Sequence, residues 1–332
     1  MELIRNYPKI ELHCHLDGSV PVKTLRELLN QSELPEEALI APKDCKSLAE
    51  YLTKFDLPLT CMQTREGLMR VAEDFLLSLQ EEHVRYVEVR FAPMQSTREG
   101  LSCREILDAV LTGLNRGKAK TGIHYQVIVC AMRHHSFEEN LHVLLTAMEF
   151  LKAGVCALDL AGDEAAYPNS NFRELFRKAK NYRMPFTIHS GECKSLANVQ
   201  DAYDFGARRV GHGIALMESP ALMEFFAKKG IGIEMCPTSN FQTKAIEKRE
   251  DYPLKRFFDA GLKVGINTDN RTVSGTNLTA ELAAALGFLA PGEEVSMDLQ
   301  RSILEKLQKN AIDTAFADDA VKQELWKHIE TF

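Results

Sequence analysis

Short apolar runs recur along the chain, and each is followed by a longer segment in which apolar residues have helical spacing. Apolar runs bounded by polar or turn residues are typical of buried parallel strands. The clearest helix begins near Thr64 and places apolar residues at three- and four-residue intervals as far as Leu79. This alternation predicts eight strand–helix units. The predicted strands span residues 10–15, 84–91, 124–132, 155–160, 185–189, 209–212, 231–236 and 263–268.

Additional helices are predicted outside the alternation. The pattern favours a helix over 22–31, and a helix over 47–55 with apolar positions 48, 51, 52 and 55 on one face; beyond Asn277 the chain is mostly helical. No Gly-rich phosphate loop follows the first strand, which argues against a dinucleotide-binding sheet. We therefore predict an α/β fold, a (β/α)8 TIM-type barrel with a helical insertion after strand 1 and extra C-terminal helices. Residues 1–332 are expected to form a single domain.

Composition narrows the possible partners and compartment. The net charge of −7 is accompanied by no basic stripe, so no surface for nucleic acid or anionic membrane lipid is expected. The eight cysteines contain no C-x-x-C pair, as expected for thiols in a reducing compartment. No leader precedes the first strand, and no apolar run approaches the roughly 20 residues of a membrane span. We expect a cytoplasmic protein.

Ionisable and metal-binding side chains gather at the C-terminal ends of the predicted strands, whereas the strand interiors look almost free of charge. A barrel of this type places catalytic groups on the rim where its strands end. Strand alternation also points His13 and His15 to the same face. Each such residue alone has a structural explanation, for example a core histidine or a helix cap, but their joint occurrence favours a site. The other polar strand ends are 159–164, 189–192, 211–213 and 267–270.

Three imidazoles and one carboxylate at these ends form a donor set suited to one zinc ion, with a coordination position left for water. Zinc lowers the pKa of bound water from about 16 to near 7, which produces hydroxide at neutral pH. The predicted ligands are His13, His15, His189 and Asp269.

Two further strand-end residues have chemistry that complements such a hydroxide. Glu192 lies three residues after His189, and we interpret it as the general acid that gives a proton to the substrate. His212, from the neighbouring strand, is expected to hold the attacking hydroxide or to stabilise charge that develops on it.

Several segments together resemble the adenosine deaminase family of the amidohydrolase superfamily. The resemblance implies a zinc-dependent barrel enzyme that converts adenosine, and also 2′-deoxyadenosine, to inosine nucleosides and ammonia by hydroxide attack at purine C6. It also implies that Glu192 protonates purine N1 and that Asp269 both binds zinc and orients the water, with His212 beside it. The matching segments are 11–18, 158–164, 187–192, 209–213, 237–240 and 267–269.

The resemblance also implies three contacts to the nucleoside. The backbone N–H of Gly162 is expected to face purine N3, and Asp17 to bind the ribose 5′-hydroxyl. Related adenine deaminases usually have glutamate in the Asp17 position, so the shorter side chain favours a nucleoside over the free base. Asn270 stands where the family commonly has a second aspartate, and its amide can donate a hydrogen bond to purine N7 at any pH. The 47–55 helix resembles the family's apolar gate, which makes Leu52 and Phe55 candidate wall residues, with core packing as the alternative.

Other functions remain open at this level. The substrate could be adenine or another amino-purine nucleoside. A superfamily hydrolase of esters, lactones or amides would usually need two metals bridged by a lysine or carboxylate at the end of the fourth strand, where Asp159, Asp163 and Glu164 stand without a lysine. A non-catalytic nucleoside-binding protein would have no need to keep Glu192 and every metal ligand.

Overall fold

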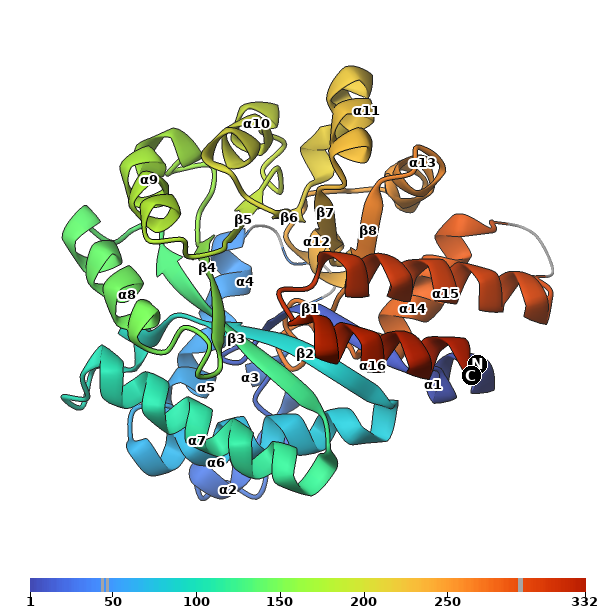
Figure 1. Cartoon of the computed structure of the whole chain (residues 1–332). Coiled ribbons are helices and arrows are strands. Elements are labelled where there is room, and N and C mark those ends of the chain that lie inside the picture. Colours follow the sequence, from blue (N-terminus) through green and yellow to red (C-terminus); the bar gives the residue numbers. More distant parts are fainter. Residues whose placement is uncertain (43–44, 46–47, 292–294) are drawn as a thin grey trace.

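Eight parallel strands surround a central axis in the computed structural model, and helices cover their outer side (Figure 1). The structure describes residues 1–42, 45, 48–291 and 295–332. The predicted strand order is confirmed, with β5, β7 and β8 slightly shorter than expected. The strands are β1 (Lys9–His15), β2 (Val84–Phe91), β3 (His124–Met132), β4 (Val155–Ala161), β5 (Thr187–Ser190), β6 (Arg209–His212), β7 (Gly232–Met235) and β8 (Lys263–Ile266).

The strands pair as two four-stranded parallel sheets, β1-β2-β3-β4 and β5-β6-β7-β8. An isolated bridge between Leu158 and Phe186 joins β4 to the start of β5. A second bridge, between Cys14 and Asp269, joins β1 to the residues after β8. These two bridges close the barrel, so the predicted α/β barrel is confirmed.

Each outer helix buries an apolar face, and several of them also have a side-chain cap at the first turn. Thr64 accepts a hydrogen bond at the start of α6, and Ser102 and Ser136 form capping boxes at α7 and α8. Burial of the inner face of each helix against the barrel stabilises the fold by about 1.5–3 kcal/mol for each large apolar side chain. These helices are α6 (Arg65–Leu79), α7 (Cys103–Thr121), α8 (Phe137–Glu149), α9 (Arg173–Asn181), α10 (Leu196–Phe205), α11 (Pro220–Lys229), α12 (Pro237–Gln242) and α13 (Leu254–Asp259).

A helical insertion follows β1, as predicted. The helix expected over 22–31 ends early, at Leu28, and the one expected over 47–55 consists of a short α-helix and a 3-10 turn. Ser47, its predicted first residue, lies outside the described residues. The elements of the insertion are α2 (Val22–Leu28), α3 (Glu36–Leu39), α4 (Leu48–Leu52), η1 (Thr53–Phe55) and α5 (Asp56–Thr60).

The predicted C-terminal helices are also present, as α14 (Leu278–Leu289), α15 (Met297–Thr314) and α16 (Asp319–Glu330). Leu325 and Ile329 form the buried side of α16. The rings of Tyr7 and Phe332 lie 5.0 Å apart, so the end of the chain packs beside α1 (Glu2–Asn6), as Figure 1 also shows.

The expectation that the strand interiors are almost free of charge is wrong. Glu88, Arg90, Arg209 and Glu234 are all buried within strands. Arg209 pairs with Glu88 and Glu234, and Arg90 also pairs with Glu234. The barrel interior accepts these charges because each is compensated by an opposite charge and by hydrogen bonds.

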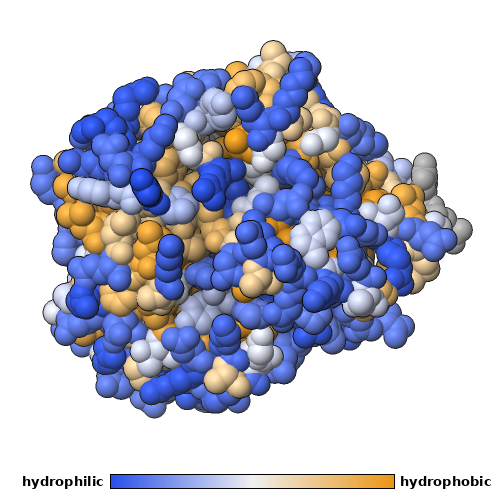
Figure 2. Space-filling view, viewed as in Figure 1, coloured by the Kyte–Doolittle hydropathy of each residue, from blue (hydrophilic) through white to orange (hydrophobic). Residues whose placement is uncertain are grey.

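Figure 2 shows the surface of the molecule from the same side as Figure 1. This surface is mainly hydrophilic, with groups of hydrophobic residues between the hydrophilic ones. Every helix among the described residues is too short or too polar to cross a membrane.

Candidate active site

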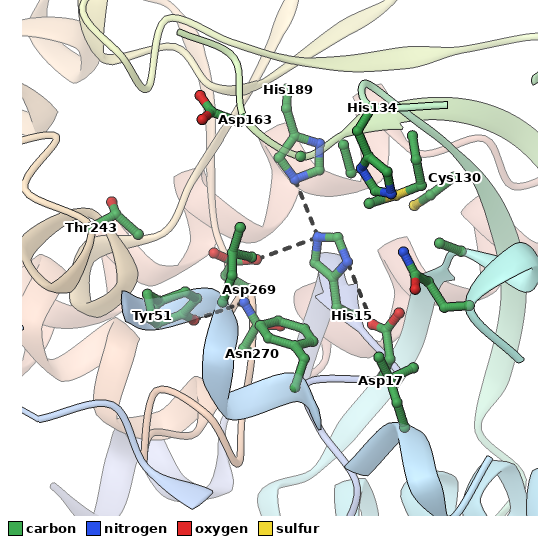
Figure 3. Close-up of a pocket in the computed structure, with 18 of the residues that line it drawn as sticks. His15, Asp17, Tyr51, Cys130, His134, Asp163, His189, Thr243, Asp269 and Asn270 are labelled. Carbon is green, nitrogen blue, oxygen red and sulfur yellow. Dashed lines mark hydrogen bonds and ion pairs between the residues drawn. The ribbon is translucent and has the colours of Figure 1, made fainter. Parts of the chain in front are cut away.

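A cavity of about 310 Å³ lies where the strands end, beneath the inserted helices. Figure 3 shows polar side chains from distant segments pointing into it. Leu52 and Phe55 line its wall, as predicted. His13 lies fully buried beside the cavity. The other predicted site residues all line it: His15, Asp17, Gly162, His189, Glu192, His212, Asp269 and Asn270.

The four predicted metal ligands converge. Each of them offers one donor atom within 4.8 Å of the others. The Nε2 atoms of His15 and His189 are 3.2 Å apart, and Oδ1 of Asp269 lies 3.5 Å from His15 Nε2 (Figure 3). The same oxygen lies 3.4 Å from Nε2 of His13. These residues come from β1, β5 and the segment after β8, so closure of the barrel brings the set together.

The protonation of the rings leaves lone pairs facing the centre of this set. His13 Nδ1 lies 2.7 Å from Glu234, and His189 Nδ1 lies 2.8 Å from Asp159. Because a carboxylate accepts, Nδ1 of His13 carries the proton, and the lone pair of its Nε2 is available to a metal. The close contact of His189 Nδ1 with Asp159 favours the same arrangement in that ring. Nε2 of His13 is buried without a hydrogen-bond partner, and burial holds the pKa of His15 well below 6.5. The donor set therefore fits a borderline divalent metal ion.

The carboxylates behind the histidines are held by one guanidinium group. Arg90 donates from Nη1 to Asp159 and from Nη2 to Glu234, each at 2.8 Å. Burial alone would raise the pKa of both acids, but Arg90 and the neighbouring imidazoles hold both pKa values below the usual range. No role was predicted for Arg90, Asp159 or Glu234 in orienting the rings. The signal that was available is the presence of charged residues within otherwise apolar strands.

Asp269 adopts a backbone conformation that few non-glycine residues adopt. Its φ is 60°, and His212 has a φ of 61°. The backbone of Asp269 is fixed by hydrogen bonds with His13 and His15, at 2.9 and 2.6 Å. Ser239 donates to Oδ2 at 2.5 Å, which leaves Oδ1 turned to the histidines. Burial would raise the pKa of Asp269, but the contact with His13 and the nearby imidazoles hold it well below its usual value.

Glu192 and His212 lie together on the cavity wall. Thr243 donates to Oε1 of Glu192 at 2.8 Å, and Oε2 lies 3.6 Å from His212 Nε2. Asn240 donates to Nδ1 of His212 at 2.9 Å, so Nε2 of this ring carries the proton that faces Glu192. The resemblance includes residues 237–240 but implies no role for them, and no sequence pattern points to Thr243.

Asp17, after β1, and Gly162, after β4, also line the cavity. Asp17 is buried, its Oδ1 has no hydrogen-bond partner, and burial raises its pKa to about 7. Gly162 has a φ of 108°, a conformation that L side chains rarely adopt. A ligand in the cavity could therefore supply the polar contact that Oδ1 of Asp17 lacks.

Asn270 is oriented by Tyr51, which the sequence pattern places only on the apolar face of a helix. Its Nδ2 donates to the Tyr51 hydroxyl at 2.8 Å, and that hydroxyl lies 2.7 Å from Ser274 Oγ. A Cβ atom at Gly18 would lie 1.8 Å from Asn270 Oδ1, so only glycine permits this approach. Figure 3 shows the contact with Tyr51. Because an amide nitrogen carries two N–H groups, one remains for a ligand in the cavity.

Nearly the whole chain is similar to proteins of one known family. The family model for adenosine deaminase matches residues 8–332. An adenosine deaminase of Enterococcus faecalis is 42% identical, covering 98% of this chain and 97% of that protein. An adenosine deaminase of Clostridium acetobutylicum is 35% identical and covers 99% of each chain. Among solved structures, an N6-mAMP deaminase of Arabidopsis superposes with a TM-score of 0.87 at 28% identity and covers 100% of each chain.

Proposed function

The chain belongs to the adenosine deaminase family, and we propose that it hydrolyses adenosine and 2′-deoxyadenosine to the corresponding inosine nucleosides and ammonia with one zinc ion. The convergence of three imidazole lone pairs and Asp269 beside Glu192 supports this reaction above others. When bound, zinc supplies a lowered pKa, near 7, for a coordinated water molecule. His13, His15, His189 and Asp269 are the residues that would hold it.

The nucleoside would be held by contacts that the free protein leaves open. Asp17 receives the ribose 5′-hydroxyl, and the backbone N–H of Gly162 faces purine N3. The remaining N–H of Asn270 donates to N7, because Tyr51 fixes the orientation of the amide. These contacts favour a nucleoside over the free base, since adenine leaves Asp17 without a partner.

Two residues of the cavity wall, Glu192 and His212, would serve the proton transfers. Glu192 gives its proton to N1 while the water oxygen bonds to C6, and the proton that the water loses restores the acid. The proton that remains on the added oxygen then moves to the amino nitrogen as the C6–N bond breaks, so ammonia leaves and the oxygen remains as the carbonyl group of inosine. Nε2–H of His212 donates a hydrogen bond to the incoming oxygen, and the contact with Thr243 keeps Glu192 on the N1 side.

The position of the strand-4 carboxylates argues against a two-metal ester or amide hydrolase. Asp159 is engaged by Arg90 and His189, behind the metal ligands. Asp163 accepts hydrogen bonds from the backbone of Ala165 and Ala166. Glu164 accepts four hydrogen bonds from the β5–α10 segment. Each carboxylate therefore already has partners that a bridging role would disrupt.

Ammonia release from adenosine, 2′-deoxyadenosine, adenine and cytidine, with a chelator-treated control, tests this function. We expect turnover of the two adenine nucleosides, much slower turnover of adenine, none of cytidine, and loss of activity after chelation. Metal analysis should give one zinc per chain. Equal turnover of adenine and adenosine would contradict the role of Asp17, and two metals per active chain would favour the rival hydrolase.

A further inference from the structure

We propose that Glu164 is a positioning residue, whose carboxylate fixes the backbone of the loop that carries Glu192. This inference rests on the proposed function, because it concerns the placement of the proposed proton donor. Glu164 follows β4 in the chain, and the loop, residues 191–195, connects β5 to α10.

The contacts of Glu164 account for both of its carboxylate oxygens. Oε1 accepts from the backbone N–H of Gly191 at 2.6 Å and from Nδ2 of Asn198 at 2.9 Å. Oε2 accepts from the N–H groups of Glu192 and Cys193 at 2.9 and 3.1 Å. With only 3% of its surface exposed, the side chain is shielded from water. One carboxylate thus binds three successive backbone amides, including that of Glu192 itself.

The loop needs this carboxylate because its backbone turns sharply. Gly191 has a φ of 82°, and a Cβ at this position would lie 2.7 Å from a methyl group of Val199. Lys194 is also left-handed, with a φ of 65°. Three consecutive N–H groups turned to one side cannot be satisfied by a regular strand or helix. A carboxylate is the natural acceptor for such a concave set of donors.

We call the carboxylate of Glu164 and the three backbone amides that it binds, those of residues 191–193, the clamp. A network of buried amide groups connects the clamp to the barrel wall. Asn198 accepts from the backbone N–H of Asn169, and Asn169 donates to Ser190 at 2.7 Å. Arg133 donates both to Asn169 and to the carbonyl of His189, each at 2.7 Å. The acceptor therefore has a fixed position relative to β5, so the loop is held in one place.

The backbone atoms from which the Glu192 side chain extends are therefore held in one position. Its carboxyl lies between Thr243 and His212, which approach from other elements. Displacement of the Glu192 backbone would keep the acid in the cavity but would change its alignment with purine N1. Misalignment on the scale of 1 Å can cost on the order of 100-fold in rate without removing the substrate contacts.

Glu164→Gln tests the clamp with little change of volume, because its amide nitrogen would face backbone donors instead of accepting from them. We expect kcat for adenosine to fall about 10- to 100-fold, with KM changed less than about threefold and one metal retained per chain. Hydrogen exchange of the 191–193 amides should accelerate by at least about tenfold. Glu105→Gln is the control, because Glu105 also accepts a backbone N–H, from Ser102, but at the remote start of α7.

The wild-type protein supplies a measurement that does not depend on a variant folding. Its 191–193 amides should exchange as slowly as those of β5, and exchange at the rate of a free loop would overturn the inference. Unchanged kcat and exchange in Glu164→Gln would overturn it as well, and so would loss of the metal with a matching rise in KM. Absence of wild-type turnover on any purine nucleoside, with slow 191–193 exchange that Glu164→Gln accelerates, would refute the proposed function while supporting the clamp.

Discussion

The proposed recognition of purine N7 depends on how the amide of Asn270 is held. Its Nδ2 is oriented by Tyr51, and its Oδ1 lies against Gly18. An amide remains a donor at any pH, whereas a carboxyl group donates only when protonated. Asn270→Ala should therefore lower kcat/KM for adenosine by a factor that corresponds to about 1–3 kcal/mol. Steady-state kinetics measure this loss, and an unchanged kcat/KM would remove Asn270 from the substrate site.

Glu192 permits a separation of binding from chemistry. Glu192→Gln keeps the size of the side chain and the contact with Thr243, but an amide cannot act as the proton donor. We expect this variant to bind zinc and purine nucleosides while losing nearly all turnover. Metal analysis, equilibrium dialysis with inosine and an ammonia assay give the three readouts. Thr243→Val is the control, because it keeps the carboxyl group of Glu192 and removes only one hydrogen bond to it, so we expect a smaller loss of turnover. Near-normal turnover of Glu192→Gln would show that Glu192 is not the general acid.

The residues that the sequence identified share one property, which is their place at a strand end. His189 and Asp269 could be predicted because a barrel gathers such ends on one rim. Glu234 could not be assigned to His13 in this way, because the two lie 221 positions apart and only barrel closure makes them neighbours. Tyr51 was hidden for a different reason. Its ring fits the apolar face of a helix, and its hydroxyl group reveals its partner only in three dimensions.

At the scale of elements, the strands were easier to predict than the short helices. A parallel strand in a barrel is buried on both faces, by the helices outside and by the core inside. Its sequence is therefore a short apolar run between polar or turn residues, which the hydrophobic pattern identifies well. The inserted helices α3 and α5 span four and five residues. Helices this short are not stable alone and form only through contacts with the rest of the protein. Their existence therefore depends on tertiary packing, which the local pattern does not encode.

The strand interiors also support the site, and Arg90 on β2 is the residue where this can be tested. Arg90→Met would leave Asp159 and Glu234 without their shared cation inside the barrel. Breaking a buried pair in this way costs about 3–5 kcal/mol. The affinity for metal should fall about 10- to 100-fold, because the two carboxylates contact the proposed ligands His13 and His189. Urea unfolding and competition with a metal chelator measure the two effects.

Arg70→Met is the matched control for that experiment. Arg70 pairs with Glu27 and Asp74 on the exposed surface of α6, where an ion pair contributes about 0–1 kcal/mol. This variant should retain both the stability and the metal affinity of the wild type to within that amount. An equal effect of the two substitutions would show that the buried position of Arg90 has no special importance.

At the scale of the whole molecule, the proposed metal joins the two halves of the barrel. His13 and His15 belong to the β1–β4 sheet, whereas His189 lies in the β5–β8 sheet and Asp269 follows its last strand. Among the described residues, strand pairing at the two seams between these sheets is reduced to isolated bridges. A ligand set that spans a seam should therefore couple metal binding to the stability of the closed barrel.

Metal removal is the experiment that examines this coupling. At a free zinc concentration 100 times its dissociation constant, binding to the folded state alone adds about 2.7 kcal/mol to the free energy of unfolding. The chelated protein should consequently unfold at a temperature several degrees lower, and zinc should restore the transition with saturation at one equivalent. Glu192→Gln should show the same shift, since Glu192 is not a proposed ligand, whereas His189→Ala should show little. Saturation at two equivalents of zinc, or an unfolding temperature that is the same with and without zinc, would contradict this proposal. Either result would mean that these four side chains do not form a single metal site that joins the two sheets.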